Sequence, residues 1–293
     1  MRGGVFIIGG GAVGRSLGAA LKAAGEPLAG VHCRSRESAA IAAEATGAEP
    51  SFGELPEHLD SAECVLVAVP DTALGEVTDR ALAAGRCRAH QVWLHTAGAL
   101  GAEALEGIAP DVRAVGAFHP PLAFPPGRLT TVPPGVRFAV DGSAAALDRA
   151  ARLAATLDGH AVRIPTAARP AYHAATVIAS NYLVTLLADS GAVLEKLGLP
   201  ASDAAQLLTT LSRSALRAVA DLGTGPALSG PIRRGDAVAV AEHLAALAGQ
   251  PEVRDLYREL GRATRRLADS VRELPAQKQR ALDALLGDNE EHD

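Results

Sequence analysis

The sequence predicts an α/β fold in which a doubly wound sheet domain is followed by an all-α domain. Three observations support this class. Short apolar runs alternate with helical patterns in the N-terminal half, as expected for a sheet built from βαβ units. The run at residues 64–69 is continuously apolar, which is typical of a strand buried on both faces of a parallel sheet. Strand patterns end near residue 164, and helical patterns fill the rest of the chain.

The elements follow in order from these patterns. We expect strands at residues 5–8, 27–33, 48–51, 64–69, 91–95, 112–118, 136–140 and 160–164. Between them we expect helices that start after Gly14, at Ser38, at an N-cap formed by Asp71 or Thr72, and at Ser143. Five further helices are expected at residues 170–197, 202–222, 236–248, 251–274 and 275–286, and the tail 288–293 is expected to be disordered. The predicted domains are therefore 1–166 and 167–293.

The segment Val5–Gly14 reads VFIIGGGAVG, an apolar strand followed by three spaced glycines and a helical pattern. The first glycine permits a tight turn, the second lets a pyrophosphate approach the backbone, and the third lets the helix pack closely on the strand. The phosphates would lie at the helix N-terminus, where unpaired N–H groups and the helix dipole attract anions. We predict a Rossmann-type dinucleotide site at Gly9, Gly11, Ala12, Val13 and Gly14. The alternative is a glycine turn with a purely structural role.

The end of the second strand indicates which dinucleotide would bind. NAD sites usually place an acidic residue there for the ribose 2′-hydroxyl, whereas NADP sites offer cations to the 2′-phosphate. Here Cys33 occupies that position and is followed by Arg34, Ser35 and Arg36, and Ser35 can also cap the next helix. We therefore predict NADP (NADPH) as the cofactor. The alternative is that both arginines are ordinary solvated side chains.

Composition excludes several other classes. The chain has 293 residues and a net charge of −5, with few aromatic residues and no basic stripe, so it does not indicate nucleic-acid binding. Its three cysteines are widely spaced, so neither a disulfide framework nor a metal site is expected, and a reducing cytoplasm fits. No export signal is recognisable, and the longest uncharged stretch, 170–188, carries polar residues that suit a buried helix better than a membrane span.

Polar groups follow three predicted strands, where ligands of open α/β sheets bind. Val69 and Pro70 follow the fourth strand and Thr96 the fifth, and we expect their backbone groups to line the nicotinamide half of the cofactor. His119 ends the sixth strand and is a candidate proton donor, because imidazole titrates near neutral pH. The alternative is a structural histidine. The Pro- and Gly-rich segment 120–134 that follows could form a wall or lid.

The first helix of the second half carries further polar candidates. His173, Thr176 and Ser180 recur at helical spacing, with Asn181 at the edge of that face, and such groups are costly in a buried interface unless they have partners. They could bind substrate or simply pack between helices. In the segment 223–236, Arg233 or Arg234 could bind a substrate carboxylate, or could be solvated in an interhelical turn.

Six segments link the chain to a known group; in order, they read GGGAVG, CRSR, HTAG, GAFHP, YHAATVIASN and ALSGPIRRGD. Through them nearly the whole chain resembles Rossmann-like oxidoreductases that carry an uncharacterised helical C-terminal domain. That group is related to pyrroline-5-carboxylate reductase, prephenate dehydrogenase and the β-hydroxyacid dehydrogenases. The resemblance implies NADP binding and a helical domain that often dimerises, but it does not imply a particular substrate. GAFHP also resembles the His-Pro segment of prephenate dehydrogenases, which favours a place for His119 near the substrate.

One departure bears on the chemistry. The β-hydroxyacid dehydrogenases use a lysine four residues before an asparagine on the corresponding helix, whereas Val177 holds that place before Asn181 here. We therefore expect an NADP(H)-dependent reductase or dehydrogenase acting on a small, anionic carbonyl or imine compound. His119 and His173 are the candidate proton donors, and Ser180, Asn181 and Arg234 would orient the substrate. The alternatives are a non-catalytic NADP-binding sensor or scaffold, and hydride exchange with a deazaflavin. The apolar helix at 174–187 also predicts a homodimer.

Overall fold

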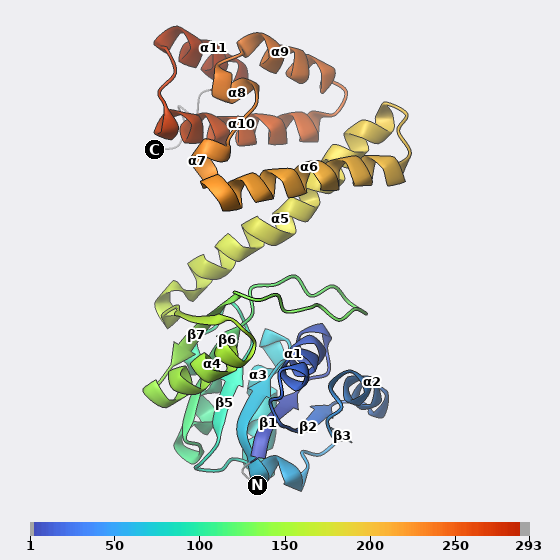
Figure 1. Cartoon of the computed structure of the whole chain (residues 1–293), viewed down its shortest axis with the longest axis vertical. Coiled ribbons are helices and arrows are strands. Elements are labelled where there is room, and N and C mark those ends of the chain that lie inside the picture. The colour runs from blue at the N-terminus through green and yellow to red at the C-terminus, as the bar shows by residue number, and fades with distance from the viewer. Residues whose placement is uncertain (1–2, 288–293) are drawn as a thin grey trace. The chain divides into compact units, whose positions relative to one another are not determined.

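The computed structural model describes residues 3–287, and the tail expected to be disordered lies outside this range. The chain divides into two compact units, residues 1–182 and 183–293, and each is described by itself. The division falls inside the long helix α5, Arg169–Lys196 (Figure 1). The predicted class, a doubly wound sheet followed by a helical region, is confirmed.

The first unit is built on one eight-stranded sheet of order β3-β2-β1-β4-β5-β6-β7-β8. Neighbouring strands are parallel except at β6–β7, which is antiparallel. The strand order reverses between β1 and β4, and such a switch point is where open α/β sheets bind ligands. The strands are β1 (Gly3–Ile8), β2 (Leu28–Cys33), β3 (Pro50–Phe52), β4 (Ala62–Val67), β5 (Val92–His95), β6 (Ala114–His119), β7 (Arg137–Gly142) and β8 (His160–Arg163).

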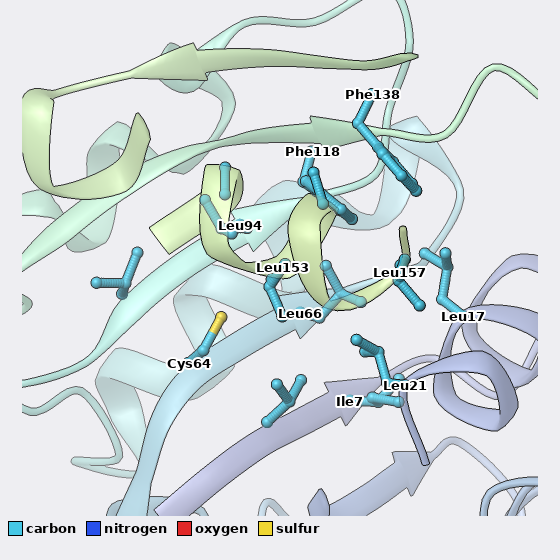
Figure 2. Packing of buried hydrophobic residues seen from close by; sticks show 14 of the residues in the cluster. Ile7, Leu17, Leu21, Cys64, Leu66, Leu94, Phe118, Phe138, Leu153 and Leu157 are labelled. Atoms are coloured by element: carbon cyan, nitrogen blue, oxygen red, sulfur yellow. The ribbon is translucent and has the colours of Figure 1, made fainter. Parts of the chain in front are cut away.

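Alternating side chains of the strands fill two cores, one on each face of the sheet. On β1, Val5 and Ile7 join the core under helices α1 (Ala12–Ala23), α2 (Arg36–Thr46) and α4 (Ala144–Thr156). Phe6 and Ile8 join the opposite core, under α3 (Leu74–Ala83) and the 3₁₀ segment η3 (Ala102–Asp111). Figure 2 shows the first core, in which the Phe118 and Phe138 rings stack. Burial on both faces explains why the central strands are continuously apolar.

Two connections in the first unit differ from prediction. Neither Asp71 nor Thr72 caps α3, because residues 71–73 form a 3₁₀ turn, η2, and Ala73 holds the N-cap position without a side-chain bond. Two other 3₁₀ segments, η1 (Glu57–Ser61) and η4 (Thr166–Ala168), precede β4 and α5. By contrast, Ser35 caps α2 as predicted, since its hydroxyl accepts a hydrogen bond from the Ser38 N–H at 3.2 Å.

The second unit is helical as predicted. Its helices are the end of α5, α6 (Ala201–Leu222), α7 (Thr224–Ala227), α8 (Pro231–Arg234), α9 (Ala237–Ala246), α10 (Pro251–Val271) and α11 (Ala276–Leu286). Its core gathers residues of α8, α9 and α11 together with Leu274. Asp236 caps α9 as the sequence suggests, because its carboxylate accepts from the Ala239 N–H at 3.1 Å.

Helix α5 is exposed rather than buried, so the expectation of a buried helix is wrong for the single chain. Arg169 is its one buried residue, although the helix has 28 residues. By length and composition alone, the stretch Thr166–Lys196 could cross a membrane, and one such helix is weak evidence of that. Ile178 is 61% exposed and Val184 is 68% exposed. The apolar residues of α5 therefore have no adequate cover within the described chain.

Candidate functional site

A cavity of about 410 Å³ lies at the switch point of the sheet, beyond the carboxyl ends of β1, β2 and β4. Its wall includes five predicted cofactor residues, Gly9, Gly11, Arg34, Val69 and Pro70. His32, Cys33 and Ser38 contribute on the β2 side, and α3 contributes Glu76, Val77 and Arg80. The cavity thus joins the glycine turn to the strand end that the sequence singled out.

Gly9 and Gly14 have the structural roles that the sequence predicts, and the backbone at Gly11 is open. Gly9 has φ +113°, and a Cβ there would lie 2.2 Å from the Ala68 carbonyl oxygen, so the turn requires glycine. At Gly14 a Cβ would lie 1.9 Å from the Gly9 carbonyl oxygen, because α1 packs directly on the turn. Around Gly11 a Cβ would meet nothing within 4 Å. That open space at the start of α1 suits the backbone approach of a pyrophosphate.

The remaining predicted cofactor residues lie close by. Ala12 and Val13 form the first turn of α1, which carries no side-chain cap and so leaves its first N–H groups available to an anion. Thr96 follows β5 and donates its N–H to the Val67 carbonyl at 3.1 Å. Thr96 is buried, and it is not among the residues that form the cavity wall.

The two arginines after β2 are separated from each other. Arg34 lines the cavity, whereas the Arg36 guanidinium lies over the Phe52 ring, 5.0 Å from its centroid. Ser35 is occupied as the N-cap of α2. In this structure Arg36 thus makes a cation–π contact outside the cavity wall, and a joint role of Arg34 and Arg36 toward the cofactor stays a prediction.

A second group of polar side chains lies at the ends of β5 and β6. His119, the last residue of β6, has its Nδ1 2.8 Å from the Tyr172 hydroxyl on α5. The His119 and His173 rings are nearly perpendicular, with centroids 6.3 Å apart. A Cβ on Gly98 would lie 2.6 Å from His173 Nδ1 and 2.9 Å from His119 Nε2. Both imidazoles therefore converge on the glycine of the HTAG segment, and only glycine leaves them room.

Burial and the nearby buried cation Arg169 set the charge states of His119 and Tyr172. Burial, with the nearby charges of Arg169, His173 and His95, lowers the pKa of His119 to about 4. Burial also raises the pKa of Tyr172, while Arg169 opposes that rise. His119 and Tyr172 are consequently both neutral at pH 7. The pair can pass a proton through its hydrogen bond but does not store one as an imidazolium.

Arg169 is the buried cation behind this pair. It is fully buried, and its guanidinium donates to the carbonyls of Ala139 and Ile164, each at 3.3 Å. Its Nη1 is buried without a hydrogen-bond partner within the described residues. A buried guanidinium with carbonyl partners keeps its positive charge, which disfavours a second positive charge on His119.

His95 has a structural part in this arrangement. Its Nδ1 accepts from the Ala97 N–H at 3.2 Å, and its Nε2 lies 2.8 Å from the Gly101 carbonyl. These two bonds fix the neutral tautomer, and burial lowers the pKa of His95 accordingly. The ring therefore holds the chain in place between β5 and η3.

The two hydroxyls of the polar stripe on α5 have partners within their own helix, whereas His173 Nδ1 is buried without a hydrogen-bond partner among the described residues. Thr176 donates to the His173 carbonyl at 2.8 Å, and Ser180 donates to the Thr176 carbonyl at 2.7 Å. The Ser180 hydroxyl also lies 2.9 Å from the side-chain oxygen of Asn181. This face is thus not buried in the single chain, and its hydroxyls have partners. Roles for Ser180 and Asn181 toward a substrate remain predictions.

The structure also gives the surroundings of Arg234 and of the segment 120–134. Arg234 is exposed at the end of α8 in the second unit, where Lys278 donates to its carbonyl at 2.8 Å. The segment 120–134 is held against α1, because the Thr130 N–H donates to the Ser16 hydroxyl at 2.9 Å. That contact favours a fixed wall over a mobile lid.

Sequence reasoning missed Tyr172 and Arg80. Tyr172 stands next to His173 in the sequence, but its bond to His119 spans 53 positions and depends on tertiary structure. Arg80 lies on a helix with no motif of its own, and only the fold brings it to the cavity wall. No cluster of metal-ligating side chains was found in residues 3–287.

The family comparisons agree with this architecture. Residues 1–120 match the model of a Rossmann-like domain, and residues 136–264 match that of a domain of unknown function, DUF2520. The chain thus carries a Rossmann-like domain followed by a DUF2520 domain, and the expected combination with an uncharacterised helical domain is confirmed. A comparison with curated proteins gives no significant match.

Solved structures share the fold over most of the chain. A Bacteroides fragilis protein to which NADP oxidoreductase activity has been ascribed is 25% identical, with a TM-score of 0.72 over 89% of this chain and 97% of that one. A pyrroline-5-carboxylate reductase from Coxiella burnetii is 14% identical, with a TM-score of 0.60 over 92% and 99%. An Aspergillus terreus reductive aminase, solved with NADPH and ethyl-5-oxohexanoate, is 16% identical, with a TM-score of 0.61 over 97% and 99%.

Proposed function

We propose that this protein is an NADP(H)-dependent oxidoreductase that reduces a small, anionic carbonyl or imine compound. One observation carries the proposal: two features lie at the same edge of the sheet. The first is an uncapped glycine turn beside a cavity, and the second is the hydrogen-bonded pair His119–Tyr172. The fold similarity to the Bacteroides fragilis protein and to the reductive aminase solved with NADPH supports an oxidoreductase role and NADP as the cofactor.

The proposed roles follow from the geometry. Bound NADPH would supply a hydride to the carbonyl or imine carbon. The heteroatom of that bond must also gain a proton, and the His119–Tyr172 pair holds a hydrogen-bonded proton beside Gly98. Both groups are neutral at pH 7, so one proton leaves from the Tyr172 hydroxyl or from an N–H of His119 to the heteroatom. A proton shift along their shared bond spreads the resulting negative charge over the pair, and uptake of one proton from water restores the neutral state. His173 would orient the substrate from the other side of Gly98.

A set of three variants tests the chemical part. We expect His119→Gln and Tyr172→Phe each to lower turnover by about 10²-fold or more, as for loss of a proton-transfer group, and to leave NADPH affinity unchanged. His173→Gln should also lower turnover without changing NADPH affinity, because the substrate would be less well oriented. The readout is NADPH absorbance with a panel of keto acids, cyclic imines and aldehydes, together with calorimetric binding of NADPH.

The second unit offers a matched control. His243 and Tyr257 form an equivalent pair, with Nδ1 2.9 Å from the hydroxyl, but on α9 and α10. His243→Gln should leave turnover intact. Full activity in the His119 and Tyr172 variants would refute the assigned roles. Binding of NADPH without turnover on any substrate would instead favour a sensor or scaffold. Turnover of NADPH with an oxidised deazaflavin alone as the hydride acceptor would favour hydride exchange with a deazaflavin.

We further propose that the protein acts as a homodimer in the cytoplasm. Helices α5 and α6 have 28 and 22 residues and bury one residue each within the described chain. Ordering two long helices without burying their apolar side chains is unfavourable, and a second copy would supply the missing cover. Three unpaired cysteines are compatible with a reducing compartment.

A further inference from the structure

A cation that does not belong to the β2–α2 segment reaches the cavity from α3. Arg80 lines the cavity, and its guanidinium donates to the Gly53 carbonyl just beyond β3. The side chain therefore extends from α3 toward the β2–β3 edge of the sheet. Burial and the charge of Arg80 are the two largest causes that lower the pKa of His32 on β2, which agrees with a guanidinium close to that strand end.

Arg34 and Arg80 thus approach the same end of the cavity from two elements. Arg34 follows β2 directly, at the place where dinucleotide sites of this architecture meet the adenosine ribose. A guanidinium has five N–H donors in a planar fork, so the bond from Arg80 to Gly53 fixes its direction and leaves donors for phosphate oxygens. Arg36, in contrast, is engaged with Phe52.

We propose that Arg80, together with Arg34, binds the 2′-phosphate that distinguishes NADP(H) from NAD(H), and that Arg36 has no part in this selection. The inference rests on the proposed function, because it assigns the residues that choose between the two cofactors. Two guanidiniums that come from different elements can each bind a dianionic phosphate through paired hydrogen bonds. A ribose hydroxyl offers no comparable charge.

Substitution of Glu76 should change the affinity for NADPH in the direction opposite to substitution of the arginines. It lies one helical turn before Arg80 on α3 and also lines the cavity. Its carboxylate would repel a phosphate dianion but could accept a hydrogen bond from a ribose hydroxyl. The balance between Arg80 and Glu76 on one helix would therefore tune the preference for NADPH over NADH.

The experiment measures calorimetric affinities of the full chain for NADPH and NADH. We expect Arg80→Gln and Arg34→Gln each to weaken NADPH binding by about tenfold or more, the usual size for loss of a charged hydrogen bond, with little change for NADH. Arg36→Gln is the matched control and should leave the ratio of the two affinities unchanged. Glu76→Gln should raise the affinity for NADPH relative to NADH.

Two further measurements keep the outcomes distinct. Thermal unfolding identifies a variant that is misfolded. Where Arg80→Gln is misfolded, Arg80→Lys keeps the charge without the planar fork and should still weaken NADPH binding measurably, though less than Arg34→Gln does. An unchanged ratio in either Arg80 variant, or a ratio lost in Arg36→Gln, would overturn the assignment of Arg80. A wild-type protein that binds NADH more tightly than NADPH would also overturn the assignment of Arg80, but it would leave the proposed oxidoreductase function standing. A protein that binds neither nucleotide would refute the proposed function itself.

Discussion

Single residues of the cavity wall carry unusual charge states. His32 is 3% exposed, its Nδ1 lies 3.1 Å from the Ser51 hydroxyl, and its Nε2 has no hydrogen-bond partner among the described residues. The Ser51 hydroxyl itself donates to the Val31 carbonyl at 3.3 Å, so it accepts from His32 and fixes the tautomer with the proton on Nδ1. The folded protein thus holds a neutral imidazole at this place.

This neutral imidazole predicts a pH dependence of stability. The pKa of His32 falls from 6.5 to about 4 on folding, so between these values the unfolded chain binds more protons than the folded one. The free energy of unfolding should therefore decrease as pH falls through this window, by about 1–3 kcal/mol for this residue. Denaturant unfolding at several pH values, compared with His32→Gln, measures the effect. Equal pH slopes for wild type and variant would contradict it.

The sequence indicates which single residues follow strands, but it does not show their partners. His119 could be predicted as a site residue because it ends an apolar run before a proline. The pairing of its ring with Tyr172, and the diversion of Arg36 to Phe52, depend on which segments the fold brings together. Such contacts leave no periodic signal in one sequence.

The element that defines the cofactor site is the turn between β1 and α1, and two of its glycines should respond differently to alanine. Gly11→Ala should leave stability within about 0.5 kcal/mol, because its φ is −71° and a Cβ meets nothing within 4 Å. It should nevertheless weaken binding of the dinucleotide, since the methyl group occupies the space that the pyrophosphate needs.

Gly14→Ala should instead destabilise the protein by several kcal/mol. Its Cβ would lie 1.9 Å from the Gly9 carbonyl oxygen, and backbone atoms there cannot move without displacing α1. Thermal unfolding and calorimetric titration with NADPH distinguish the two variants. Comparable unfolding temperatures for Gly11→Ala and Gly14→Ala would show that the helix does not pack on the turn as described.

Most elements could be predicted from the sequence because each has a clear signal. Most strands contain a short apolar run, as in β1 and β4, and the predicted and observed bounds of the strands differ by only a few residues. The short helices α7 and α8 were missed because dense Gly and Pro in residues 223–236 predict a loop. The reversal of strand direction between β6 and β7 has no sequence signature; β7 runs antiparallel to β6 and parallel to β8.

The molecule as a whole should be a dimer whose stability depends on concentration. Leu211 on α6 is 63% exposed, and Leu211→Glu should shift the protein from dimer to monomer in sedimentation at micromolar concentration. The monomer should also unfold at a lower temperature. Leu82→Glu is the matched control, because Leu82 is 37% exposed on α3 in the first unit and should not affect assembly. A wild-type protein that sediments as a monomer would exclude the second copy.

The buried Arg169 has a practical consequence for anyone who wishes to produce the nucleotide-binding half as a separate recombinant fragment. Ending the polypeptide at residue 166 would remove Arg169, whose guanidinium donates to the Ala139 and Ile164 carbonyls. It would also remove Tyr172, whose hydroxyl is hydrogen-bonded to His119. Termination after Tyr182 retains all of these contacts, matches the limit of the first compact unit and should give the better-behaved truncation.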